Sequence, residues 1–363
     1  MTPLARHLAE RIRATGPMPL SDYMAEALMH QTHGYYATRD PFGAGGDFIT
    51  APEITQMFGE LVGLCLAQAW LDQGSPAPFT LAELGPGRGT LMADVWRATA
   101  RVPGFHAGAR LHLVEQSPTL RARQRDALTG LGVTWHDDPA SLLDAPLFLV
   151  ANEFFDALPI RQFVRQGAGW AERQVGLSPA GSLIWGLSPP APVPALDHRL
   201  TDTAEGDVVE LCPALPAIAT PLAARIARRG GVAVAIDYGH WRSLGDTLQA
   251  VAAHQAADPL AAPGEADLTA HVDVEALARA FAAGGAAVTA MERQGAWLLR
   301  LGLAERTERL AARLTGAALH NHRAAFTRLT APHQMGDLFK VIACHPPGTP
   351  VPAGLTRPPE PRA

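Results

Sequence analysis

The sequence predicts an α/β fold in which a largely parallel sheet carries helices on both faces. Two observations lead to this prediction. Short, continuous apolar segments alternate with segments of helical spacing, as buried parallel strands and their crossover helices do. A glycine-rich turn at residues 85–89 follows the first of these apolar segments, at the point where a strand would pass into a helix.

The expected elements follow in order along the chain. Helical spacing predicts helices over residues 4–14 and 19–30, the second with Ser21 or Asp22 as its N-cap. A third helix should begin near Pro52. The expected strands are 79–84, 110–114, 132–135, 146–151, 231–236, 286–292 and 338–344, and further helices are expected over 273–283 and 303–328.

The chain is longer than one hydrophobic core usually organises, because 363 residues exceed the usual limit of about 250–300. We expect a helical N-terminal cap over residues 1–78, a core over 79–345 and a proline-rich tail over 346–363. Insertions are expected at about 160–210, with the short alternating segments of a β-hairpin, and at 240–272, with little periodicity. We interpret this surplus as an addition to a single sheet that binds the substrate, which favours a large substrate over a small metabolite.

Composition and charge exclude several classes of function. The net charge of −5 gives no basic footprint for nucleic acid. Lys340, the single lysine, follows no glycine-rich turn, which excludes Schiff-base chemistry and a Walker-type phosphate loop. The three cysteines lie far apart and offer neither a disulfide framework nor a CxxC site. No apolar segment suits a signal peptide or a membrane span, so we expect a cytoplasmic protein without membrane insertion.

The strongest functional signal is the turn that begins at Glu83 and reads ELGPGRGT. Gly85, Gly87 and Gly89 allow the backbone to turn sharply and to approach a ligand closely, and the following helix presents its positive end. This pattern is typical of a nucleotide-cofactor turn. Its GxGxG spacing differs from the GxGxxG of NAD-binding folds, which argues against a nicotinamide-dependent oxidoreductase. A tight turn without a ligand is the structural alternative.

Acidic residues follow the next two strands. Glu115 lies 26 residues beyond Gly89, where a carboxylate can accept hydrogen bonds from the two hydroxyls of a ribose. Its alternative is a solvated acid at a strand end. Asp137, after the third strand, is a candidate contact for an adenine amino group.

The fourth strand ends in an unusually polar segment. Asn152, Glu153 and Asp156 surround two phenylalanines at the edge of the sheet where ligands bind in open α/β folds. These side chains could form a pocket for a cationic or hydrogen-bonding group of a substrate. In the alternative interpretation, the phenylalanines pack in the core and Asp156 caps a helix.

Three further residues are candidates for the mouth of the substrate site: Asp47, Glu53 and His271. Glu53 could equally be a favourable acid in the first turn of a helix. We expect no metal site, because no Cys or acid cluster accompanies the histidine pairs at 30 and 33 or 320 and 322, which suit surface or capping roles.

Several segments together resemble one family. They are GDFITAPEITQMFGE (46–60), LAELGPGRGTLMAD (81–94), LVEQSPTLRARQ (113–124), ANEFFDALPIRQF (151–163), IDYG (236–239), GDTLQA (245–250), GEADLTAHVD (264–273) and MGDLFKV (335–341). The chain resembles the MidA-like family of S-adenosylmethionine-dependent methyltransferases, whose mitochondrial members are arginine methyltransferases that act in the assembly of respiratory complex I. The resemblance implies a class I methyltransferase fold, Rossmann-like, with seven strands of which the last is antiparallel.

The resemblance also implies roles for residues. It makes Gly85, Gly87 and Gly89 the turn against the methionine part of S-adenosyl-L-methionine, Glu115 the ribose ligand and Asp137 a candidate adenine contact, with Asn152 and Glu153 beside the transferable methyl group. A protein substrate is implied, with a subunit of the NADH:quinone oxidoreductase as the candidate. The cytoplasm is the expected compartment of a bacterial chain and the mitochondrial matrix that of a eukaryotic one. A non-catalytic assembly scaffold and a methyltransferase for another acceptor are the alternatives.

Overall fold

The computed structural model describes residues 2–38 and 50–359, and these fold into two compact units. We treat each unit by itself. The core unit comprises Ile49–Phe155, Pro216–Trp241 and Val274–Ala363, and the inserted unit comprises Met1–Phe48, Asp156–Leu215 and Arg242–Asp273. The expected N-terminal cap of residues 1–78 is thus divided between the two units.

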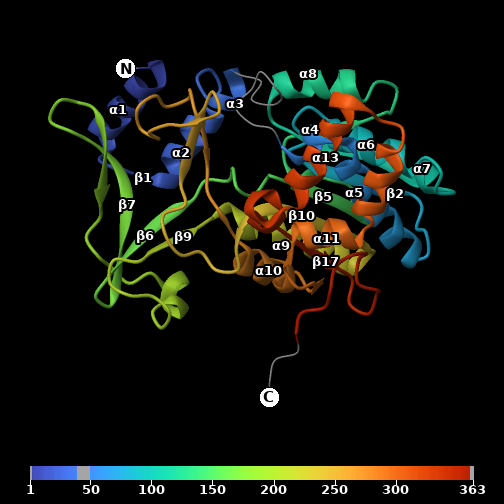
Figure 1. Ribbon diagram of the computed structural model, residues 1–363. Helices are drawn as coiled ribbons and strands as arrows, with labels where there is room; N and C mark the ends of the chain where they lie inside the picture. Colours follow the sequence, from blue (N-terminus) through green and yellow to red (C-terminus); the bar gives the residue numbers. More distant parts are fainter. Residues whose placement is uncertain (1, 39–49, 360–363) are drawn as a thin grey trace. The chain divides into compact units, whose positions relative to one another are not determined.

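The core unit is built on the predicted sheet (Figure 1). Its strands are β2 (Phe79–Leu84), β3 (Ala109–Val114), β4 (Thr134–His136), β5 (Leu147–Asn152), β10 (Gly231–His240), β15 (Ala287–Val288), β16 (Glu292–Arg293) and β17 (Phe339–His345). They run in the order β4-β3-β2-β5-β10-β17-β15, and β16 also pairs with β17. The strands from β4 to β10 are parallel to their neighbours, whereas β17 is antiparallel to β10. This confirms the fold class.

The strand expected over 286–292 is divided into β15 and β16. Val288 pairs with Cys344 and Glu292 pairs with Val341. Between these two pairs the chain advances four residues on the side of β15 and β16 but only three along β17. One extra residue in a paired strand is a β-bulge, which interrupts the ladder and splits the strand.

Helices complete the core unit. They are α4 (Ala51–Ile54), α5 (Gln56–Asp72), α6 (Thr90–Thr99), α7 (Phe105–Gly108), α8 (Pro118–Ala127), α9 (Ala214–Arg229, mostly in this unit), α10 (Val274–Ala283), α11 (Gln294–Arg300), α12 (Leu303–Ala311) and α13 (Gly316–Thr330), with short helices η1 (Pro139–Ser141) and η3 (Pro332–Gly336). The single helix expected over 303–328 is two helices, because Thr315 between them has an extended backbone, with φ −139° and ψ 165°. Helices α5 and α6 approach closely at Gly59, where a Cβ would lie 2.6 Å from the Cβ of Asp94.

The inserted unit combines helices with two antiparallel sheets. The helices are α1 (Pro3–Thr15), α2 (Leu20–Met29), α3 (Tyr35–Thr38) and η2 (Pro194–Arg199), and the strands are β1 (Met18–Pro19), β6 (Arg161–Gln166), β7 (Gly169–Leu177), β8 (Leu183–Leu187), β9 (Val208–Leu211), β11 (Gln249–Ala252), β12 (Gln255–Ala256), β13 (Asp267–Thr269) and β14 (Val272–Asp273). One sheet has the order β1-β7-β6-β9 with β8 on β7, and the other has the order β12-β11-β13. The expected N-cap of the second helix is wrong, because α2 already begins at Leu20 after Pro19.

Three separate stretches of sequence build the hydrophobic core of the inserted unit. Leu8 and Tyr23 come from the N-terminal helices, Ile160 and Val175 from the first insertion, and Leu268 from the second, and all five are buried in one cluster. The insertions therefore fold together with the N-terminal segment. Among the described residues, no helix is both long and apolar enough to cross a membrane.

Candidate functional site

The glycine turn between β2 and α6 requires its glycines. Gly85, Gly87 and Gly89 all have left-handed backbones, with φ of +61°, +52° and +84°. Other L residues adopt this region only with strain. A Cβ on Gly85 would also lie 3.0 Å from the ring of Phe154. The turn ends with Gly89 as N-cap of α6, and this glycine offers no side chain to cap the helix terminus.

Glu83 places a buried carboxyl group beside this turn. Glu83 is only 2% exposed. Burial raises the pKa of Glu83 from its ordinary 4.5 to about 8, against a hydrogen bond from the Met92 backbone that lowers it, while the negative charge of Glu115 adds to the rise. Its Oε2 atom is buried and has no hydrogen-bond partner among the described residues. A buried acceptor of this kind needs a donor, which a ligand or a water molecule would supply.

Glu115 follows β3, and its carboxylate already accepts hydrogen bonds from neighbouring groups of the protein. The Ser117 backbone N–H donates to its Oε1 at 2.8 Å, and the Gln124 amide donates to its Oε2 at 3.2 Å. Burial raises the pKa of Glu115, and these two donors act in the opposite direction. The Gln116 backbone N–H is a third donor, and a carboxylate offers about four lone-pair positions, so room remains for a further hydrogen bond.

Asp137 directly follows β4 and is largely exposed. Its side chain is 82% exposed and pairs with the guanidinium of Arg121 at 2.6 Å. The same Arg121 donates through Nε to the backbone carbonyl of Glu115 at 2.7 Å. Arg121 therefore links the two acids that the sequence singles out, whereas the adenine contact of Asp137 stays a prediction.

The end of β5 holds Glu153 in a strained conformation. Glu153 has φ +52°, which is uncommon for a residue other than glycine. Its Oε1 accepts hydrogen bonds from the Asn152 amide at 3.0 Å and from the Ala51 backbone N–H at 3.2 Å. The Oδ1 atom of Asn152 is buried and lacks a partner within the described part of the chain. Strain of this kind clusters at functional sites.

Asp237 in β10 supports this strained turn, and sequence reasoning missed it. Its carboxylate accepts the backbone N–H groups of Phe154 at 3.2 Å, Phe155 at 2.9 Å and Tyr238 at 3.0 Å. Asp237 is 5% exposed. An acid at the end of the apolar run GVAVAI is the signal that could have revealed it.

Gln124 in α8 is a second residue that sequence reasoning missed. It is fully buried, and its amide contacts Glu115, the glycine turn and Trp135. Its position between Leu120 and Leu128, on the buried stripe of the helix, is a signal that could have drawn attention to it.

The other candidates lie in different places. Glu53, in the first turn of α4, accepts a hydrogen bond from the Thr90 hydroxyl at 2.6 Å, so it lies at the start of α6. Asp47 lies outside the described residues. His271 belongs to the inserted unit, where its backbone N–H donates to the Thr247 hydroxyl at 2.8 Å. Asp156 also belongs to the inserted unit.

Asp156 is 6% exposed and shares an acidic environment with Asp267. Burial, followed by the charges of Asp267 and Asp156, raises the pKa of Tyr36 well above its ordinary value. Within the core unit, by contrast, the structure gathers Glu53, the glycine turn with Glu83, Glu115 and the polar end of β5 at the carboxyl ends of the parallel strands.

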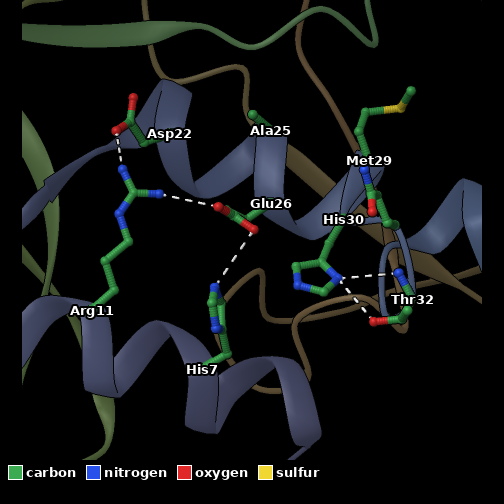
Figure 2. Close-up of a pocket in the computed structure, with 9 residues that line it drawn as sticks. His7, Arg11, Asp22, Ala25, Glu26, Met29, His30 and Thr32 are labelled. Atoms are coloured by element: carbon green, nitrogen blue, oxygen red, sulfur yellow. Dashed lines mark hydrogen bonds and ion pairs between the residues drawn. The ribbon is translucent and has the colours of Figure 1, made fainter.

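His7 lies beside the Arg11–Glu26 ion pair, and His30 hydrogen-bonds to Thr32 close by (Figure 2). One ligand atom each of His7, Glu26 and His30 lies within 4.8 Å of the others, beside a surface cavity of about 500 Å³. However, Glu26 is paired with Arg11 at 3.2 Å. Nδ1 of His30 accepts the backbone N–H of Thr32 at 3.3 Å, which places the proton of the neutral ring on Nε2. This arrangement does not favour a metal ion, and the absence of a metal site stays a prediction.

The raised pKa of Glu83 predicts a pH-dependent stability. Between about pH 4.5 and pH 8, Glu83 is protonated in the folded protein and ionised in the unfolded chain. The folded protein therefore has its full stability below pH 4.5 and loses it as the pH rises through 8. Glu83→Gln should remove this loss. At 1.36 kcal/mol per pKa unit, the variant should gain at most about 4 to 5 kcal/mol over the ligand-free wild type by pH 8.5.

Thermal unfolding of both proteins from pH 5 to pH 8.5 measures this difference. Glu292→Gln is the matched control, because Glu292 lies away from the turn and pairs with Arg300 at 2.8 Å. Parallel pH profiles for wild type and Glu83→Gln would contradict the prediction.

Comparison with known proteins shows which proteins this chain is similar to. Residues 61–291 match a family model described as an S-adenosyl-L-methionine-dependent methyltransferase. The proteins named protein arginine methyltransferase NDUFAF7, mitochondrial, are similar to this chain. The Bos taurus protein is 35% identical over 95% of this chain and 84% of its own length, and the Danio rerio protein is 36% identical over 94% and 86%.

Solved structures agree with these relatives. A crystal structure of a protein from Burkholderia thailandensis bound to S-adenosyl-homocysteine has a TM-score of 0.81 and 31% sequence identity, and the match covers 97% of this chain and 93% of that one. A second structure from the same organism has a TM-score of 0.78 and 32% identity, over 94% and 91% of the two chains. The similarity therefore extends over nearly the whole chain.

Proposed function

The chain belongs to the family of S-adenosyl-L-methionine-dependent methyltransferases, and from this premise we propose that it methylates arginine side chains of a protein. The proposal is supported by relatives at 35–36% identity that are named protein arginine methyltransferases. It agrees with the acidic, polar end of β5. A scaffold that has lost catalysis is not favoured, because a scaffold has no need of buried acceptors beside an intact glycine turn.

The residues of the core unit fit S-adenosyl-L-methionine. The cofactor carries a positively charged amino group and two ribose hydroxyls. When bound, it supplies a methyl group that is activated by a sulfonium. We propose that the buried acceptors on Glu83 and Asn152 suit the cationic part, since both Glu83 Oε2 and Asn152 Oδ1 lack protein partners among the described residues. Glu115 would accept the ribose hydroxyls, and Asp137 would face the adenine.

The acceptor chemistry explains the need for carboxylates. A guanidinium keeps its proton, with a pKa above about 12, so an enzyme must bind, align and partly neutralise it before one nitrogen can attack a methyl group. We propose Glu153 and Asp156 for this task, because carboxylates match the planar fork of donors in arginine. Alignment of the reacting atoms can lower the barrier by roughly 7–11 kcal/mol.

Glu153 is the observation that carries the proposal. Asn152 and Ala51 hold its Oε1 atom, while Asp237 holds the next turn of backbone. A carboxylate that is fixed in this way meets a cation without first being ordered, which reduces the entropic cost of binding. Glu53 and Asp47 stay candidates for the substrate mouth, together with His271.

The proposed acceptor is a subunit of the NADH:quinone oxidoreductase, in the bacterial cytoplasm or, for a eukaryotic chain, in the mitochondrial matrix. Mass spectrometry of that complex from cells with and without this protein tests the proposal. We expect at least one arginine to be methylated only in cells that contain the protein. Identical arginine methylation in both samples would exclude this substrate, and methylation of another residue type or a small molecule would support the alternative acceptor.

A further inference from the structure

Gln124 lies where three elements of the cofactor site meet. It belongs to α8 and is fully buried. Its Nε2 atom donates to the carbonyl oxygen of Gly87 at 2.7 Å and to Oε2 of Glu115 at 3.2 Å. Its Oε1 atom accepts the indole N–H of Trp135 at 2.8 Å. One side chain thus connects the glycine turn after β2, the acid after β3 and the strand β4.

The orientation of this amide follows from its partners. The indole N–H of Trp135 can only donate, so the Gln124 atom beside it must be the oxygen. The two remaining hydrogens of the amide then point to two acceptors, the Gly87 carbonyl and the Glu115 carboxylate. Each polar atom of Gln124 therefore has a partner in one arrangement, and a satisfied buried network of this kind specifies a single geometry.

We propose that Gln124 is a positioning residue for the cofactor, which fixes the Glu115 carboxylate relative to the glycine turn so that both engage one ligand. The proposal rests on the proposed role of Glu115 as the ribose ligand. Gln124 also packs against the glycine turn, because a Cβ on Gly89 would lie 3.4 Å from the Gln124 Cα.

The hydrogen bond from Gln124 also affects the ionisation of Glu115. Burial raises the pKa of Glu115, and the donors on Ser117 and Gln124 lower it. A ribose ligand requires the carboxylate as an acceptor, so binding should weaken as the pH falls and Glu115 takes up a proton. Without the Gln124 donor, this weakening should begin at a higher pH.

Calorimetric titration with S-adenosylhomocysteine and with adenosine tests the proposal. Gln124→Leu should bind both ligands roughly 10- to 100-fold more weakly, as expected for the loss of a hydrogen bond to a charged group. The midpoint of its pH profile should lie above that of the wild type, because a donor that lowers the pKa of Glu115 is lost. Gln294→Leu is the matched control, because Gln294 is equally buried and donates to the Leu329 carbonyl at 3.2 Å, away from the site.

Gln124→Glu separates positioning from simple loss of packing. Two carboxylates at this distance share a proton. We therefore expect weak binding at pH 8.5 and partial recovery towards pH 6, where the shared proton restores a donor. Gln68→Glu is its matched control, since exposed Gln68 donates to Asp72 at 2.8 Å and the change likewise places two carboxylates together.

The outcomes distinguish the two proposals. Unchanged affinity and an unchanged pH profile in Gln124→Leu, or an equal loss in Gln294→Leu, would overturn the role of Gln124. If Gln124→Leu does not fold, the pH dependence of Gln124→Glu decides. Glu115→Gln tests the underlying assignment: full binding by this variant would overturn the ribose role of Glu115 itself.

Discussion

Gly89→Val should abolish binding of S-adenosylhomocysteine and, with it, all methyl transfer. Gly89 has φ +84°, which a β-branched residue adopts only as an outlier. Its new Cβ would already be in van der Waals contact with the Gln124 Cα at 3.4 Å and the Leu128 side chain at 3.5 Å, and the two branched methyl groups would have to fit among the same atoms. The turn must then change shape, and the Gly87 carbonyl that accepts from Gln124 moves with it. Calorimetric titration with S-adenosylhomocysteine measures the result.

Gly130→Val is the matched control for this prediction. Gly130 lies in the same unit with nearly the same backbone conformation, φ +83°, but a Cβ there would meet no atom within 4 Å. Both variants should lose stability from backbone strain, of order 1–3 kcal/mol. Only Gly89→Val should lose the ligand. Retained binding by folded Gly89→Val would show that the glycine turn does not contact the cofactor.

Glu153→Gln should lower the rate of methyl transfer by roughly 100- to 1,000-fold while the affinity for S-adenosylhomocysteine changes little. The amide is isosteric, and its oxygen can still accept from Asn152 and Ala51, so the turn should keep its shape. What is lost is the negative charge that is proposed to pair with the guanidinium. Transfer of radiolabelled methyl groups to proteins from cells that lack the enzyme measures the rate.

Glu292→Gln also controls for this substitution. Glu292 accepts from the Thr356 hydroxyl at 2.6 Å and pairs with Arg300, so it too is a partly buried acid with two partners. Its variant should transfer methyl groups at the wild-type rate. A wild-type rate for Glu153→Gln would move the guanidinium role to another acid, and Asp156→Asn is then the next variant to measure.

Much of the core unit could be predicted because its signals are local. The buried strands β2 and β5 are continuous apolar runs, and their expected bounds differ from the structure by at most one residue. The turn at residues 85–89 was recognisable because positive φ angles require glycine. The division of the strand at 286–292 was not, because the bulge depends on its register against β17.

The supporting residues of the site were beyond sequence reasoning for a related reason. Gln124 acts on a carbonyl 37 residues away, and Asp237 acts on backbone groups 82 and 83 residues away. Neither type of residue indicates a function by itself. Their roles appear only when β3, β5 and β10 lie in their places beside β2 in the sheet.

The sequence by itself determined the α/β class, the glycine turn and the acidic residues after successive strands, because apolar runs, glycines and strand ends are local patterns. The tertiary structure decided that the N-terminal helices and both insertions share one hydrophobic core, so that the surplus length forms a compact unit of its own. It also decided which side chains hold Glu115 and the turn after Glu153 in place. Burial and hydrogen bonding join residues that are far apart in sequence, and strand order and register determine which of them meet.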